Sequence, residues 1–116
     1  MSTGARTPEE LETLFEDALV MRDREAVAEL FEAGAVLLAG DGPPTCGGKE
    51  IAGLSLAMSD GDRAYVADPQ YVIQARDIAL IVAEQGINVA RRGRDGDWRY
   101  VIVRLSIEDE TARRKQ

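Results

Sequence analysis

The segment 98–107 near the end of the chain constrains the fold more than any other. Its residues alternate between two sets, and both sets are largely apolar: Val101, Val103, Leu105 and Ile107 in one, and Trp98, Tyr100 and Ile102, followed by Arg104 and Ser106, in the other. Successive side chains of a strand point to opposite faces, so a strand that is apolar on both is covered on both sides. The segment therefore predicts a sheet with helices on one face and a second subunit on the other.

Helix signals precede the strands. Thr7 is expected to cap a helix that begins at Pro8, because proline suits the first helical position and Glu10 completes a capping box. Asp23 is expected to cap a second helix that runs through residue 32, with Gly34 ending it. Residues 49–58 predict a third helix through their apolar spacing.

Strands are expected at residues 35–39, 65–76, 78–92 and 97–107, with Asp95-Gly96 as a hairpin turn and Gly86 as a candidate β-bulge. The order predicts an α+β fold, a cone-shaped curved antiparallel sheet with three N-terminal helices packed in its concave face. The domain spans residues 8–107. Residues 1–7 are expected to form a disordered N-terminus and residues 108–116 a frayed charged tail.

Charge and composition exclude several classes of function. The 116 residues hold 14 basic and 21 acidic side chains, a net charge of −7, which argues against binding to nucleic acid or to an anionic membrane surface. Cys46 is the single cysteine, so no intrachain disulfide forms, and the expected location is the cytoplasm. No histidine is present, so the Ser-His and Cys-His catalytic pairs are absent, and neither a metal nor a cofactor is expected.

The order of elements resembles the nuclear-transport-factor-2-like superfamily, in particular its small SnoaL-like and DUF4440-like members. The residues that carry the resemblance are Asp41-Gly42-Pro43-Pro44, Gly48-Lys49-Glu50-Ile51 and Gly96-Asp97-Trp98-Arg99. The resemblance implies a homodimer, formed through the outer face of the sheet, whose cone holds an apolar pocket for a small apolar or carbonyl-bearing ligand.

The catalytic residues of the known members are not matched. The isomerases of this superfamily use a tyrosine in the first helix, where this chain has Phe15 and Leu19 on the inner face. A histidine late in the last strand is replaced by Arg104. The Asp-Arg-Asp relay of the epoxide hydrolases has only Arg76-Asp77 and Arg104 as loose counterparts.

The residues that are expected to point inward from these helices and strands are the predicted pocket residues. They are Phe15, Leu19, Leu54, Met58, Tyr71, Asn88, Trp98, Tyr100, Ile102 and Arg104, while Val101, Val103, Leu105 and Ile107 are expected at the dimer interface. Core and pocket wall are nearly the same surface in such a cone. These residues therefore pack the core, contact a ligand, or do both.

Three polar residues are weak candidates for chemistry. Glu84 is expected on the inner face, as a general base or as the ion-pair partner of Arg104, unless it marks a bulge in solvent. Arg104 anchors an anion or carbonyl group, forms a structural salt bridge, or lies at a strand end already in solvent. Asp41 is either a base at the rim or a residue that favours the turn before Gly42.

Three functions remain open from the sequence. The first is a homodimeric small-molecule-binding protein with an apolar pocket. The second is an isomerase, cyclase or hydrolase that uses a pocket carboxylate as general base, which rests on fold analogy. The third is a non-catalytic dimerisation module whose cone is filled by Trp98, Phe15 and Met58.

Overall fold

The computed structural model describes residues 4–58, 69–83 and 86–105. Their elements are α1 (Pro8–Val20), α2 (Arg24–Glu29), β1 (Phe31–Ala39), β2 (Thr45–Cys46), α3 (Gly48–Met58), β3 (Pro69–Ala75), β4 (Ile78–Ala83), β5 (Gly86–Arg92) and β6 (Trp98–Leu105). The predicted tail, residues 108–116, lies outside the described residues, as do the start of the predicted strand 65–76 and Glu84. No helix among the described residues is long and apolar enough to cross a membrane.

The helix starts follow the predicted caps. The Thr7 side chain accepts a hydrogen bond from the backbone N–H of Glu10, and Pro8 opens α1. The Asp23 side chain accepts from the N–H of Ala26 and opens α2. The predicted end of α2 is wrong, however: the helix stops at Glu29, and Gly34 lies inside β1. Residues 31–34 belong to β1 instead, where Phe31 pairs with Tyr100 of β6 and the pairing resumes at Val36.

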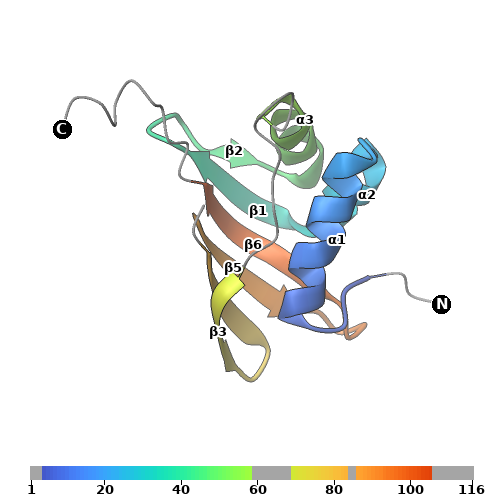
Figure 1. The fold of residues 1–116 in the computed structure, drawn as a ribbon, viewed down its shortest axis with the longest axis vertical. Coiled ribbons are helices and arrows are strands. Elements are labelled where there is room, and N and C mark those ends of the chain that lie inside the picture. The colour runs from blue at the N-terminus through green and yellow to red at the C-terminus, as the bar shows by residue number, and fades with distance from the viewer. Residues whose placement is uncertain (1–3, 59–68, 84–85, 106–116) are drawn as a thin grey trace.

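The sheet has the order β2-β1-β6-β5-β4-β3, and β1 runs parallel to β6 while the other pairs are antiparallel. It is curved and does not close into a barrel. All three helices lie on one side of it, with α1 running across the middle strands and α3 near β1 and β2 (Figure 1). This is the predicted α+β cone, with the helices in the concave face and no helix of the described residues on the opposite face.

The predicted middle strand, residues 78–92, is two strands. β4 and β5 form a hairpin in which Ala83 pairs with Gly86 and Ile81 with Asn88. Directly paired residues point to the same face, so Asn88 shares a face with the buried Ile81 and not with Ile78. The pairing of Ala83 with Gly86 reverses the alternation that a single strand would have kept. Asn88 is nonetheless inward, as expected, for a different reason.

A bulge in β6 changes which of its side chains point inward. Tyr100 pairs with Ala90 and Ile102 with Val89, so Val101 is an extra residue on β6. An extra residue shifts all following side chains to the other face. Val103 is therefore fully buried in the single chain, while Ile102 is 43% exposed. The sequence predicted the reverse for both residues, and Arg104 is likewise exposed on the outer face.

The first described residues pack against the hairpin between β5 and β6. Ala5 is fully buried and forms an isolated antiparallel bridge with Trp98, whose N–H donates to the Ala5 carbonyl. Arg6 forms a salt bridge with Asp97. Ala5 and Arg6 are thus tied to the start of β6 and to the turn before it.

Candidate functional site

Three polar side chains meet inside the otherwise apolar space between α1 and the sheet. Glu12 of α1 is fully buried, Asn88 of β5 is 2% exposed, and Tyr100 of β6 is fully buried. Nδ2 of Asn88 donates to Oε2 of Glu12 over 3.0 Å, and the Tyr100 hydroxyl donates to the same oxygen. We call these three residues the interior polar cluster. It joins the first helix to the two central strands.

The helical position of Glu12 explains why it points inward. It lies three residues before Phe15 and seven before Leu19, which places all three on adjacent parts of one helix face. Phe15 and Leu19 are 1% and 5% exposed. Glu12 was not predicted as an inward residue, because a charged residue in an amphipathic helix is normally solvated. Its spacing from Phe15 and Leu19 was the available signal.

Aromatic rings fill the space next to the interior polar cluster. The Phe15 and Tyr100 ring centroids are 5.4 Å apart, Phe15 and Phe31 are 5.7 Å apart, and Phe31 and Tyr100 are 5.2 Å apart. Edge-to-face arrangements such as those of Phe15 are favoured by the ring quadrupoles. The rings fix the orientation of Tyr100, and so they hold its hydroxyl on Glu12.

One polar atom of the interior polar cluster has no hydrogen-bond partner among the described residues. It is Oδ1 of Asn88, whose other amide atom donates to Glu12. If the amide were turned over, Oδ1 would face a carboxylate oxygen, and both atoms are acceptors. The orientation with Nδ2 on Glu12 is therefore the one that hydrogen bonding permits, and it leaves an acceptor buried among apolar side chains.

The structure separates the predicted pocket residues into two groups. Phe15, Leu19, Asn88, Trp98 and Tyr100 are buried, and Leu54 and Met58 of α3 are partly buried. Tyr71, Ile102 and Arg104 instead lie on the outer face, and Tyr71 is 64% exposed. The buried group lies on the same side of the sheet as the helices. It contains two members of the interior polar cluster, Asn88 and Tyr100.

Two cross-strand rows of mostly apolar side chains cover the middle of the outer face. Pairing places Tyr71, Val82, Ile87, Arg104 and Leu38 in one row and Ile73, Leu80, Val89, Ile102 and Val36 in the other. We call these ten residues the outer rows. Ile73, Ile87 and Ile102 are 60%, 43% and 43% exposed in the single chain. An exposed apolar patch of this kind is typical of an interaction surface.

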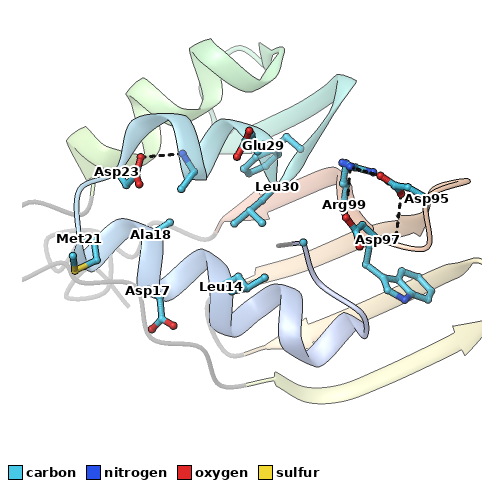
Figure 2. Close-up of a pocket in the computed structure, with 14 residues that line it drawn as sticks. Leu14, Asp17, Ala18, Met21, Asp23, Glu29, Leu30, Asp95, Asp97 and Arg99 are labelled. Atoms are coloured by element: carbon cyan, nitrogen blue, oxygen red, sulfur yellow. Dashed lines mark hydrogen bonds and ion pairs between the residues drawn. The ribbon is translucent and has the colours of Figure 1, made fainter. Parts of the chain in front are cut away.

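A groove of about 780 Å³ lies on the other side of α1 from Glu12, between α1, α2 and the turn before β6 (Figure 2). Leu14 of α1 and Leu30 face each other across it, and the exposed Asp17 and Asp23 lie at its edge. Leu14 follows Glu12 by two residues, which is about 200° around a helix. The groove and the interior polar cluster are therefore separate features.

Ion pairs stiffen the hairpin at one end of the groove. Arg99 donates to both carboxylate oxygens of Asp95, and the backbone N–H of Asp97 donates to Asp95 as well (Figure 2). The hydrogen bonds from Arg99, which have the largest effect, and that from the Asp97 N–H lower the pKa of Asp95 to about 2. The same pair raises the pKa of Arg99. Arg91 binds Glu32 through two hydrogen bonds, which raises the pKa of Arg91.

Asp95 is expected to titrate at about 2, below its ordinary value of 3.8. Because this pKa is lowered in the folded protein, the pair stabilises the fold above pH 3.8 and loses that effect as the pH falls toward 2. Carboxyl ¹³C NMR of the Arg99→Met variant should show the Asp95 pKa moving up toward 3.8, whereas Arg91→Met should leave it in place. An Asp95 that titrates near 3.8 in the unaltered protein would contradict the pairing.

Two of the predicted catalytic candidates, Asp41 and Arg104, form no ion pair with each other. Asp41 is exposed in the turn between β1 and β2, and Arg104 forms no ion pair with another described residue. Glu84 lies outside the described residues. In the part of the chain that is described, no three His, Cys, Asp or Glu side chains are grouped so that they could hold a metal ion. Glu12 is the carboxylate that the described structure places inside the cone.

Comparison with known proteins identifies the fold. No family model matches the sequence, and no curated protein matches it. A solved structure from Thiobacillus denitrificans, named for the calcium/calmodulin-dependent protein kinase type II association domain, has a TM-score of 0.72 and 18% identity over 93% of this chain and 100% of that one.

Two further structures agree. A ketosteroid isomerase-like protein from Erwinia carotovora atroseptica has a TM-score of 0.67 and 19% identity, covering 87% of this chain and 94% of that one. A protein of the NTF2-like family from Streptomyces avermitilis has a TM-score of 0.65 and 19% identity, covering 86% and 92%. Similarity at this identity concerns the fold alone. The chain has the fold of the nuclear-transport-factor-2-like superfamily.

Proposed function

We propose that this chain is a small-molecule-binding protein that works as a homodimer, in the cytoplasm as its single cysteine suggests. The observation that carries the proposal is the interior polar cluster. A buried carboxylate is costly unless hydrogen bonds compensate it, and an apolar residue would fill the same space more cheaply. A few convergent polar groups in an apolar interior are the usual means of orienting a small ligand. The ligand would contact Asn88 on the concave face.

The geometry supports binding more than base catalysis. A base would have to take a proton from a substrate, and Oε2 of Glu12 already accepts hydrogen bonds from Asn88 and Tyr100. An oxygen with two donors has little remaining capacity to accept a third. The alternative of an isomerase, cyclase or hydrolase would therefore have to use the other carboxylate oxygen of Glu12 as the base, or rearrange the interior polar cluster.

Binding can be tested by NMR of the ¹⁵N-labelled full chain with a library of small apolar compounds. The expected hits shift the amide signals of Glu12, Asn88 and Tyr100. Hits that shift only residues of the groove, such as Asp17 and Asp23, would contradict the interior site. A dimer that binds none of the compounds would favour the second candidate, a non-catalytic dimerisation module. The packed rings of Phe15, Phe31 and Tyr100 are the observation that favours this candidate.

The dimer is proposed to form through the outer rows. A twofold axis brings one patch against itself, so the apolar rows of two copies would cover each other and give β6 the second apolar contact that its sequence predicts. Arg104 would lie within this contact. The proposed interface uses the outer face of the sheet with Ile102 in place of the expected Val103, which is buried in the single chain. The expected interface residue Ile107 lies outside the described residues.

Ile102→Glu is expected to give a monomer at concentrations where the unaltered protein is dimeric. Each copy would bring a new carboxylate into the apolar interface, where burying a charge is costly. Sedimentation velocity measures the result. Met21→Glu is the matched control, because Met21 is 76% exposed on the helical side of the molecule. If Ile102→Glu remains a dimer, or if Met21→Glu becomes a monomer, the outer rows are not the interface.

A further inference from the structure

We propose that the interior site selects ligands that carry a hydrogen-bond donor, an O–H or N–H group, over ligands recognised through a carbonyl oxygen. The inference rests on the proposed function, because it names the class of molecule that the same site would take. It differs from the carbonyl-bearing ligand that the sequence suggested, and it follows from which atoms of the interior polar cluster are donors and which are acceptors.

The side-chain donors of the interior polar cluster are turned toward Glu12. A carbonyl ligand needs donors aimed at its oxygen, as in an oxyanion hole. Here the Tyr100 hydroxyl, which has one proton to donate, gives it to Oε2 of Glu12, and Nδ2 of Asn88 donates to the same atom. Binding a carbonyl through the Tyr100 hydroxyl would break a hydrogen bond to a fully buried carboxylate, which is costly. Nδ2 of Asn88 has a second N–H, but this nitrogen already has a partner in Glu12, so a carbonyl there would satisfy no atom that lacks one.

The atom of the interior polar cluster that lacks a partner in the described structure is an acceptor. Oδ1 of Asn88 has no partner among the described residues, and its residue is 2% exposed. The side chains beside Asn88 in its cross-strand row are Ile81 and Val103, both fully buried and apolar. A buried water needs two to four polar partners, so this apolar setting suits it poorly. A ligand with an apolar body and one donor would satisfy Oδ1 and pack against this row.

Alcohols and amines share this donor chemistry, and a matched panel separates them from ligands without it. The panel holds the alcohol, the amine, the ketone and the methyl ether of each of several skeletons, from cyclohexane to indane and decalin. Dissociation constants come from NMR titration of the full chain, followed at the Glu12, Asn88 and Tyr100 signals. The alcohol, the amine or both are expected to bind about three- to tenfold more tightly than the matched ketone and ether.

Two variants assign that preference to Asn88. Asn88→Leu keeps the size of the side chain and removes Oδ1 together with the Nδ2 donor to Glu12, so the tighter binding of alcohols and amines relative to the matched ketone should disappear. Ser55→Ala is the matched control, because the Ser55 hydroxyl is the other buried side-chain oxygen with no partner among the described residues. It should leave the preference unchanged. A preference that survives in Asn88→Leu would overturn the assignment.

The panel separates failure of the inference from failure of the proposed function. If all four members of a skeleton bind alike at the interior signals, or if the ketone binds best, the donor preference is wrong and the interior site stands. If no member of any skeleton shifts those signals, the proposed interior site is wrong, and the inference falls with it. Both decisions come from the unaltered protein and do not depend on whether a variant folds.

Discussion

Asn88→Asp is expected to lower the free energy of unfolding by about 3–5 kcal/mol. The substitution replaces the Nδ2 donor, 3.0 Å from Oε2 of Glu12, by a carboxylate oxygen. Two carboxylates would then face each other in a place where Glu12 is fully buried and residue 88 is 2% exposed. Like charges at this distance cannot both remain ionised without a large cost. Urea denaturation at neutral pH measures the effect.

Two further variants separate charge repulsion from the loss of a hydrogen bond. Asn88→Leu removes the donor without adding a charge and is expected to cost about 1–3 kcal/mol. The double variant Glu12→Gln with Asn88→Asp exchanges donor and acceptor, so it should recover part of the stability lost in Asn88→Asp. If the two substitutions of the double variant add independently, Glu12 and Asn88 do not interact as described.

Phe15→Ala is expected to destabilise the protein by about 3–5 kcal/mol. Phe15 is 1% exposed, and its ring lies 5.7 Å from that of Phe31 and 5.4 Å from that of Tyr100. Its removal leaves a cavity and frees the Tyr100 ring that holds a hydrogen bond to Glu12. Thermal and urea unfolding measure the loss of stability.

Met21→Ala is the control for this substitution, since Met21 ends the same helix and is 76% exposed. It should change the stability by no more than about 0.5 kcal/mol. A Phe15→Ala variant that loses as little as the control would show that the aromatic packing contributes little, and the account of how Tyr100 is positioned would then be wrong.

The local signals of the sequence predicted the helix starts and the fold class. Thr7, Pro8 and Asp23 act through neighbours a few residues away, so the sequence contains the whole mechanism of each cap. The hairpin turn at Asp95-Gly96 is local in the same sense, and Gly96 has the positive φ of 87° that this turn requires.

Which side chains of a strand point inward depends on pairing between strands, and the linear sequence pattern does not contain this information. The register of β4 against β5 and the extra residue Val101 each shift the alternation by one, and each is defined only by pairing with another strand. Val103 and Ile102 were exchanged between inside and outside for this reason. The apolar content of the last strand still predicted correctly that its concave side is buried.

Glu12 was the largest omission at the candidate site. Its partners Asn88 and Tyr100 are 76 and 88 residues away in the sequence, so nothing local distinguishes it from the exposed Glu9 and Glu10 of the same helix. Its phase on α1 matches that of Leu19, and only the position of the sheet shows that this phase is buried. Asn88 and Tyr100 were predicted as inward residues, but not their common contact.

Native mass spectrometry of the full chain as purified, followed by a denaturing run, tests the central claim most directly. The account predicts a dimer, with small-molecule mass that is either present on purification or taken up from the alcohol and amine members of the panel, and that is released on denaturation. A monomer that carries no small molecule, before or after addition of the panel, would contradict both the interior binding site and the dimer formed through the outer rows.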